Sequence, residues 1–324
     1  MAWIENLDNL EDFSHEFTIT TPVGIHFMGP VFLFNRAPYA CWSNGEIRCL
    51  LDNSLLTAFT EMGYVGRFFA SDRAIYGIGG VSGSNGVTGY FKKIVLATLA
   101  ETTLYTHATA NAANAHCSLV HPGEAVFTMG GDAFMTVRKI DLSDDSVTEL
   151  VDLGAGLHNA KAGGTATTCY YSYRDGVIHY YKSVPMAGGG STDIDNSSDT
   201  YFVGVDGWHL LGADIWNGPH TESWNYGTVE PKSLLILNKA VPFHVLVLTA
   251  ESTVRRLLHL RLNADFSTTL IKEYYETDTA AANGYFYNSG INYPFAHGTV
   301  KPSVLYRPYY NKLLEWKLPY KDMI

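Results

Sequence analysis

Short apolar runs recur in pairs along this chain, and a tight turn separates the two runs of each pair. In each copy, three or four apolar or aromatic residues reach a turn of polar, proline or glycine residues and return as a second run, which is typical of a β-hairpin. Six such hairpins follow one another in 324 residues, about one every 54 residues. The predicted hairpins lie at 31–42, 67–76, 118–127, 168–181, 233–248 and 303–316.

Two further β-like runs follow each of the first five hairpins. In the clearest case, Leu258–Leu262, apolar and polar residues alternate with a period of two, as expected for a strand with one buried face. Each repeat therefore predicts four antiparallel strands. The third strands are predicted at 47–50, 93–96, 138–142, 200–205 and 258–262, and the fourth at 55–59, 103–107, 147–151, 208–211 and 268–272.

This repeat resembles the six-bladed β-propeller superfamily, and the resemblance covers nearly the whole chain. The resemblance is one of architecture only, because the signatures of two named repeat families are missing. No Trp-Asp dipeptide occurs. The Kelch repeat has a glycine pair at the end of the second strand of every blade, whereas here only Gly79-Gly80 and Gly130-Gly131 have that position. The resemblance implies an all-β fold; a β-sandwich with the same strands is the alternative. It implies one domain, 1–324, with blades at 24–66, 67–115, 116–158, 159–219, 220–280 and 281–324.

The sixth hairpin has no third and fourth strands after it. Residues 1–20 contain β-like runs at Trp3–Leu7 and Phe13–Thr20, and we expect these closing strands to pair beside Leu314–Leu318. Pairing the two ends of the chain would remove free sheet edges, which promote aggregation.

Composition excludes several classes of protein. The chain has 46% hydrophobic and 17% charged residues, which is typical of a folded globular protein. Its net charge of −10 disfavours binding to nucleic acid, because a negatively charged surface repels the negatively charged phosphate groups. The most apolar stretch, Ala240–Ala250, is shorter than the roughly 20 residues of a membrane-spanning helix. The first sixteen residues lack a basic residue, so we expect no signal peptide and no membrane insertion. Unless the protein belongs to a virion, as considered below, we expect a cytoplasmic location.

The cysteine spacing matches neither a metal site nor a disulfide framework, so all four thiols are predicted to be reduced. Asn44-Gly45 between two apolar runs predicts a two-residue hairpin loop. In that register Cys41 is opposite Arg48 and Ala40 is opposite Cys49, so the two thiols would point to opposite faces. The cysteines are Cys41, Cys49, Cys117 and Cys169.

The chain contains no motif of a known catalytic or cofactor site. Asp193, Asp195 and Asp199 have the spacing of a calcium loop, but Ser198 stands where that loop requires glycine, so a solvated acidic loop is expected. The twelve histidines show no spacing typical of metal ligands. We therefore predict no metal and no cofactor.

Some propellers cleave glycosides with paired carboxylates on the axial face. Candidates at or near strand ends are Asp72, Glu124, Asp175 and Asp206. Because Asp175-Gly176 and Asp206-Gly207 also suit hairpin turns, the turn interpretation is favoured. A carbohydrate-active hydrolase is therefore kept as the alternative function.

Three insertions interrupt the repeat, at 182–199, 213–231 and 277–302. Loops of more than about 12 to 15 residues are often functional. Tyrosine and tryptophan offer a large contact area at low entropic cost, so the aromatic residues of the last two insertions are predicted to bind a partner, or alternatively to pack as small local cores. They are Trp216, Trp224, Tyr226, Tyr285, Tyr287 and Tyr293.

Low charge combined with 21 Tyr and 30 Gly also resembles bacteriophage virion proteins. This resemblance implies a structural or binding protein without enzymatic activity. It would belong to a phage tail or capsid surface, would be made in the host cytoplasm, and would hold a protein neighbour or a receptor glycan through its loops.

Overall fold

The computed structural model describes residues 15–18, 32–35, 37–71, 73–82, 84, 86–110, 115–121, 123–131, 134–199, 201–203, 207–227, 231–236, 242–251, 254–276, 304–309 and 312–317. These residues form 27 β-strands, and none of them belongs to a helix that could cross a membrane.

The strands form seven antiparallel sheets, which we number in chain order. Sheet 1 contains β2 (Phe32–Phe34), β3 (Ala37–Cys41), β4 (Glu46–Cys49) and β5 (Leu55–Ala58). Sheet 2 contains β6 (Tyr64–Ala70), β7 (Ala74–Gly80), β8 (Val87–Val95) and β9 (Glu101–Ala110). Sheet 3 contains β10 (His116–His121), β11 (Glu124–Gly131), β12 (Phe134–Asp141) and β13 (Val147–Gly154). Sheet 4 contains β14 (Leu157–Gly164), β15 (Thr168–Asp175), β16 (Ile178–Pro185) and β17 (Thr192–Ser197).

Sheet 5 contains β18 (Phe202–Val203), β19 (His209–Leu211), β20 (Asp214–Trp216) and β21 (Ser223–Asn225). Sheet 6 contains β22 (Pro231–Ile236), β23 (Phe243–Glu251), β24 (Val254–Leu262) and β25 (Thr268–Glu276). Sheet 7 has three strands, β1 (His15–Thr18), β27 (Lys312–Lys317) and β26 (Val304–Tyr309), in that order across the sheet.

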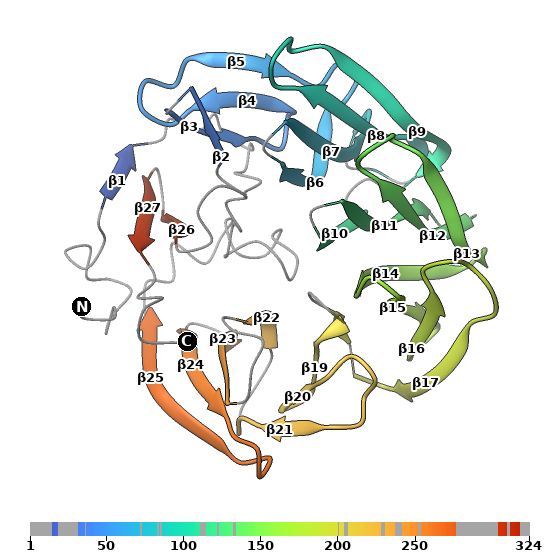
Figure 1. Ribbon diagram of the computed structural model, residues 1–324, viewed down its shortest axis with the longest axis vertical. Coiled ribbons are helices and arrows are strands. Elements are labelled where there is room, and N and C mark those ends of the chain that lie inside the picture. The colour runs from blue at the N-terminus through green and yellow to red at the C-terminus, as the bar shows by residue number, and fades with distance from the viewer. Residues whose placement is uncertain are drawn as a thin grey trace.

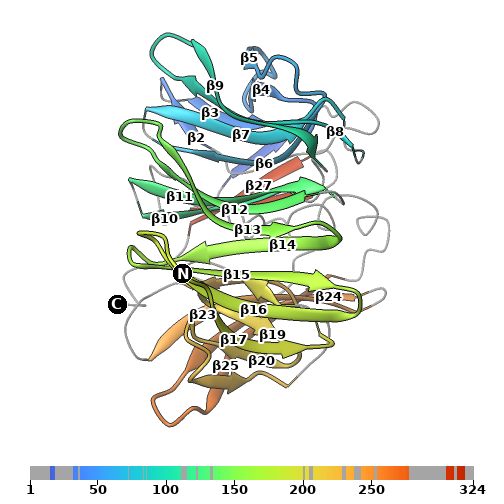
Figure 2. The ribbon, with the colours of Figure 1, turned by 90° about the vertical axis from the view of Figure 1, so that its right-hand side faces the viewer.

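The seven sheets are arranged in a ring around a common axis (Figure 1). In sheets 1 to 4 and in sheet 6, the first strand in sequence lies nearest the axis and the fourth lies at the rim. Seen from the side, successive sheets pack face against face (Figure 2). The chain is therefore a β-propeller, which confirms the predicted all-β antiparallel architecture.

The number of blades differs from the six expected, because residues 202–225 form a sheet of their own. The sequence pattern predicts 200–211 as part of the fourth blade and 213–231 as an insertion, and both predictions are wrong. Two properties of the sequence explain the error. The strands of sheet 5 are only two or three residues long, and β14, which begins sheet 4, has the sequence LHNAKAGG, with no β-branched residue and no Phe, Tyr or Trp. The prediction of one domain over 1–324 stays a prediction.

The two ends of the chain meet in sheet 7. β1 pairs with β27 in an antiparallel register that places His15 opposite Glu315 and Phe17 opposite Leu313. This confirms that a strand within Phe13–Thr20 closes the last sheet against the C-terminal hairpin. The other predicted closing strand, Trp3–Leu7, lies outside the described residues.

The core lies between neighbouring sheets, so a typical sheet is covered on both faces. All seven residues of β7 are buried, which explains why its sequence is a continuous apolar run instead of an alternating one. Between sheets 2 and 3, Phe91 packs against Phe127, with ring centroids 4.7 Å apart. This aromatic contact joins sheet 2 to sheet 3.

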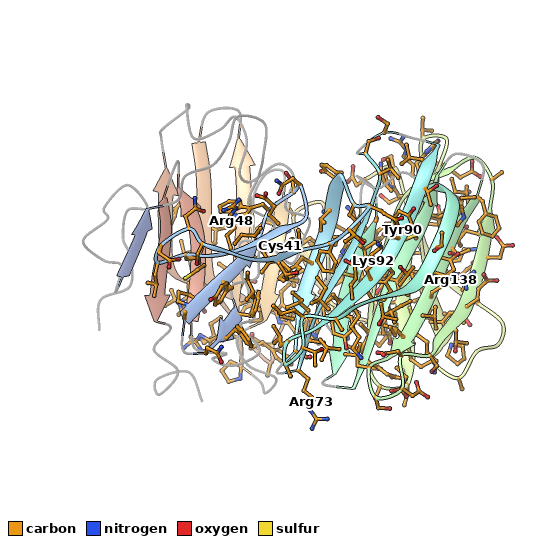
Figure 3. The ribbon with its side chains drawn as sticks, turned by 90° about the horizontal axis from the view of Figure 1, so that it is seen from above. Cys41, Arg48, Arg73, Tyr90, Lys92 and Arg138 are labelled. Carbon is orange, nitrogen blue, oxygen red and sulfur yellow. The ribbon has the colours of Figure 1, made fainter. Side chains whose placement is uncertain are left out.

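The cysteine residues are free and buried, as expected for reduced thiols. The register around Cys41 differs by one residue from the prediction: Cys41 is opposite Ile47, and Tyr39 is opposite Cys49. The loop has three residues, because the Trp42 amide donates to the carbonyl of Glu46 and Gly45 adopts a φ of 85°. Cys41 (labelled in Figure 3) and Cys49 therefore lie on the same face, and the prediction of opposite faces is wrong.

Candidate functional site

Three of the six predicted binding residues lie in or beside sheet 5. Trp216 ends β20, Trp224 is the central residue of β21, and Tyr226 follows β21. Residues 213–226 are thus part of a blade and do not form a loop insertion. The other three, Tyr285, Tyr287 and Tyr293, lie outside the described residues.

Trp224 belongs to the core between sheets 5 and 6. Its side chain is 2% exposed and stacks on Trp208 with ring centroids 5.5 Å apart. Its Nε1–H donates to the carbonyl oxygen of Asn263, at 2.9 Å, in the turn between β24 and β25. Packing and a hydrogen bond occupy the Trp224 ring, as the alternative of a small local core describes, and its binding of a partner stays a prediction.

Trp216 is half-buried and lies against a histidine. Its ring stacks on His220 with centroids 3.8 Å apart and an interplanar angle of 5°. The position of His220 is set by Asn217, whose carbonyl accepts from the His220 amide and whose side chain accepts from the Thr221 amide. This loop gives His220 a φ of 61°, a conformation that a non-glycine residue adopts only when its surroundings impose it.

Tyr226 faces a pocket between sheets 5 and 6. The pocket has a volume of about 340 Å³ and a mainly apolar lining. β24 and β25 form one wall and the residues at the end of β21 form the other, so the pocket lies toward the rim of the ring (Figure 1). The lining residues are Asn225, Tyr226, Gly227, Leu258, Leu260, Thr268, Leu270 and Glu273.

The hydroxyl of Tyr226 donates to the carbonyl oxygen of Gly212, at 2.9 Å, which fixes the ring on the pocket wall. Burial raises the pKa of Tyr226 well above its ordinary value, and nearby Asp214 adds to the shift. Tyr226 is therefore a neutral wall residue and not an acid or base at neutral pH.

Large apolar side chains are exposed beside this pocket. Leu270, on its lining, is 52% exposed, and Ile271, the next residue of β25, is 42% exposed. Phe266, in the turn before β25, is 52% exposed and lies 5.7 Å from the Trp224 ring. Phe266 also has a φ of 63°, a left-handed conformation that is unfavourable for a non-glycine residue. Leu270, Ile271 and Phe266 are not among the binding residues predicted from the sequence.

The structure also brings together two histidines from different segments, His209 of β19 and His220 of the loop between β20 and β21. His209 Nε2 lies 2.8 Å from His220 Nδ1, and His209 Nδ1 lies 3.0 Å from the Gly207 carbonyl oxygen. Because a carbonyl only accepts, His209 Nδ1 must donate to it, and the neutral ring then accepts at Nε2 from His220 Nδ1–H. The Nε2 atom of His220 faces Asp195 of β17 at 3.4 Å. The chain of contacts joins sheet 5 to sheet 4.

This histidine chain is a structural contact at neutral pH. Burial lowers the pKa of His209 to about 3, and burial also lowers the pKa of His220, so both rings are neutral. Asp195 accepts a hydrogen bond from the Tyr201 hydroxyl at 2.6 Å. Within the described part of the chain, no three histidine, cysteine or acidic side chains are grouped so that they could hold a metal ion.

The calcium-like spacing falls on a strand and its end. Asp193 and Asp195 belong to β17, where Asp193 pairs with Lys182 at 2.7 Å. Their carboxylates therefore have protein partners within and next to the sheet. The expected solvated acidic loop is wrong for these residues, because part of the predicted insertion at 182–199 is β17, the fourth strand of sheet 4.

Two of the four candidate hydrolytic carboxylates lie among the described residues. Glu124 begins β11 of sheet 3 and lies 3.5 Å from Lys139. Asp175 ends β15 of sheet 4 and is exposed, and Gly176 after it has a φ of 58°, as the hairpin-turn interpretation requires. Asp72 and Asp206 lie outside the described residues. Glu124 and Asp175, the two described candidates, therefore belong to different sheets.

Comparison with known proteins supports the fold. No protein-family model matches the sequence, and no curated protein matches it. Among solved structures, the chain is similar to the Dos1 propeller, with 8% identity and a TM-score of 0.52 over 88% of this chain and 77% of that one. It is also similar to TolB from Acinetobacter baumannii, with 11% identity and a TM-score of 0.42 over 82% and 67%.

A puromycin-hydrolyzing peptidase of Mycobacterium tuberculosis matches with 9% identity and a TM-score of 0.49, over 79% of this chain and 46% of that one. At such low identity the similarity to the Dos1 propeller shows the fold alone. Nothing in these comparisons supports the resemblance to bacteriophage virion proteins.

Proposed function

We propose that the protein is a non-enzymatic binding propeller that holds a neighbouring protein at the pocket between sheets 5 and 6. The observation that carries this proposal is the rim pocket of about 340 Å³, which Tyr226 and the half-exposed Leu270 line. Apolar side chains that remain exposed next to a concave, apolar surface are typical of interaction sites.

The charge of the protein favours one kind of partner. Glu273 lies on the pocket lining, and the whole chain carries a net charge of −10. Such a surface attracts positively charged partners and repels a second copy of the chain. We infer that the occupant is a protein segment with a leucine-like or phenylalanine-like anchor flanked by lysine or arginine.

Two adjacent residues of β25 provide a matched test. Leu270 lines the pocket, whereas Ile271, the extra residue where the pairing of β24 with β25 shifts register, is not part of the lining. A displayed library of random twelve-residue peptides would be selected on the unmodified protein and then compared on Leu270→Asp and Ile271→Asp. We expect selected peptides with an apolar anchor between basic residues, and their binding should weaken by about 2 kcal/mol or more only in Leu270→Asp.

Peptides that bind both variants equally, or the absence of any selected sequence, would refute the proposal for this pocket. A glycan array probed in parallel tests the other expected ligand, a receptor glycan. Glycan binding that Leu270→Asp abolishes would replace the protein partner with a carbohydrate.

We propose further that the assembly is a virion, as a tail or capsid-surface component. Support for this finer proposal is the composition, with 17% charged residues and 21 Tyr, and the rigid ring of sheets. Mass spectrometry of purified particles from the source of the gene tests it: the protein should be present in a fixed ratio to the other particle proteins. Its absence from the particles would refute the virion role while leaving the pocket proposal intact.

A further inference from the structure

The strands of sheet 5 are much shorter than those of sheet 6, against which they pack. β20 and β21 have three residues each, whereas β24 and β25 have nine each. Three-residue strands cannot cover the whole face of nine-residue strands, and Leu270 on that face is still 52% exposed. The rim pocket lies between the end of β21 and this part of β24 and β25 (Figure 1), where a further strand of sheet 5 would continue the cover.

β21 directs the backbone groups of alternate residues away from β20. The Tyr226 amide donates to the Ala213 carbonyl at 3.0 Å, so the backbone groups of Tyr226 face β20. Successive residues of a strand direct these groups to opposite edges, so those of Ser223 and Asn225 face outward. Among the described residues, sheet 5 ends at β21, and no strand pairs with this outward edge.

Asn225 brings the outward edge of β21 to the pocket. It belongs to the pocket lining, although its side-chain Nδ2 donates to Asp214 Oδ1, at 2.8 Å, on the neighbouring strand β20. Because the side chain is directed to Asp214, the outward backbone N–H and C=O of Asn225 face the pocket. Gly227, which has no side chain, also lines the pocket. The backbone of this strand edge therefore forms part of the pocket wall.

The opposite wall of the pocket is made of side chains on one face of sheet 6. Leu258 and Leu260 occupy alternate positions of β24, and Leu270 of β25 is opposite Leu260. Thr268 lies further along β25, and its buried hydroxyl has no hydrogen-bond partner among the described residues. An extended segment beside β21 would direct every second side chain onto the leucines, and a polar group at its end would satisfy the Thr268 hydroxyl.

The edge of β25 is less suitable for such pairing. The register of β25 with β24 shifts at Ile271, which is an extra residue on β25. A bulge of this kind disrupts a strand edge and protects it from pairing with another chain. The pairing of β21 with β20 is regular over all three residues. The edge of β21 is therefore the one that can accept a further strand.

We propose that the partner segment binds in an extended conformation along the outward edge of β21, as a fifth strand of sheet 5. This inference rests on the proposed function, because it specifies how the partner occupies the rim pocket. The outward backbone groups of Ser223 and Asn225 form hydrogen bonds with the segment, and its alternate apolar side chains pack on sheet 6. Residues 207–227 contain Asp214 and Glu222 and no lysine or arginine, which favours basic residues at the ends of the segment.

Methylation of the backbone of a bound peptide tests this mode of binding on the unmodified protein. The tightest of the selected twelve-residue peptides would be synthesised with one amide N-methylated at a time, which removes a donor and adds bulk at one edge of its backbone. We expect affinity to fall by roughly tenfold at two or more alternate residues, whose amides face β21, and to change by less than about twofold at the residues between them.

Two substitutions at Asn225 test the same edge from the side of the protein. Asn225→Pro removes the outward N–H without removing a bond to β20, because that N–H faces away from β20. Asn225→Ala is the matched control, since it also loses the side-chain bond to Asp214 but keeps the N–H. We expect Asn225→Pro to weaken peptide binding by roughly tenfold and Asn225→Ala to leave it unchanged.

The outcomes separate the mode of binding from the proposed function. Methylation effects that do not alternate along the peptide, or equal affinities of folded Asn225→Pro and Asn225→Ala, would overturn strand addition. The proposed function would still hold if Leu270→Asp weakened binding of the same peptide. Peptides that bind Leu270→Asp as tightly as the unmodified protein, or a selection that yields no peptide, would overturn both proposals. The methylation series decides the question if Asn225→Pro does not fold.

Discussion

Replacing Lys92 with methionine should destabilise the protein far more than the same change at Lys93. The Lys92 side chain is 2% exposed and lies among the packed side chains of sheet 2 (Figure 3). Its Nζ donates to the Thr60 carbonyl at 2.7 Å and to Glu101 Oε1 at 2.9 Å. The ammonium therefore ties the segment between sheets 1 and 2 to the outer strand β9.

The expected loss in the free energy of unfolding depends on how well the Glu101 carboxylate is solvated and hydrogen-bonded once Lys92 is removed. Removing one partner of a fully buried ion pair costs about 3–5 kcal/mol. Glu101 is 19% exposed and keeps two hydrogen bonds from Thr60, so it stays partly solvated and paired. We therefore expect a loss of about 2–3 kcal/mol in the free energy of unfolding. This corresponds to a melting temperature lowered by about 5 °C.

Lys93 is the matched control because it is the next residue of β8 and points to the opposite face. It pairs with Asp145 at 2.7 Å, but both side chains are partly exposed, at 17% and 29%. Such a pair contributes about 0–1 kcal/mol. Urea unfolding, followed by tryptophan fluorescence, measures both variants. Equal losses for Lys92→Met and Lys93→Met, or a loss below about 1 kcal/mol at Lys92, would refute the argument from burial.

The double variant Lys92→Met/Glu101→Gln checks the same reasoning. Burial raises the pKa of Glu101, but hydrogen bonds from Thr60 and Lys92 outweigh it, so the pKa lies below its ordinary value. This carboxylate therefore stabilises the fold at a pH above its unfolded pKa, and the contribution is lost as the pH falls through the folded pKa. Neutralising Glu101 should restore part of the stability that Lys92→Met removes.

Three further predictions concern the core, the histidines and the ends of the chain. Trp224→Ala should lower the free energy of unfolding by about 3–5 kcal/mol in urea titrations, because it empties the space between sheets 5 and 6. Burial lowers the pKa of His209 to about 3 and that of His259 to about 4, so the unfolded chain binds more protons than the folded chain below about pH 6.5. Stability measured by urea titration should therefore fall as the pH is lowered from about 6.5 toward 4, and a constant midpoint would contradict this. Deleting residues 1–20 removes β1 and exposes an edge of β27, so light scattering should detect aggregation; a truncated chain that melts like the full chain would contradict it.

The sequence predicted the propeller because its hairpins are long and apolar. β6 and β7 contain Phe68, Phe69, Ile75 and Tyr76, whose burial requires cover on both faces of the sheet. Sheet 5 was missed since its strands are too short for a periodic pattern. The register at Cys41 was missed by one residue because an Asn-Gly pair also suits a three-residue loop in which only Gly45 has a positive φ.

The candidate site was harder to predict than the fold. Tyr226 was singled out as an aromatic residue, and the structure places it on the rim pocket. Leu270 and Phe266 have the same residue types as the core, and sequence alone does not show which apolar residues stay exposed. The pairing of His209 with His220 depends on the loop between β20 and β21, which no helix or strand periodicity reveals.

The pairing of β1 with β27 has a consequence for how the ring forms. His15 and Glu315 are opposite each other, so this contact closes almost the entire chain into a loop, whereas sheets 1 to 6 pair strands that are close in sequence. Closing a long loop carries the largest entropic cost, and non-local pairing is slow. Folding should therefore proceed blade by blade and end with a separate closure step. A circular permutant that joins the present ends and opens a loop between two other sheets should fold to the same ring with that closure step moved to the new ends.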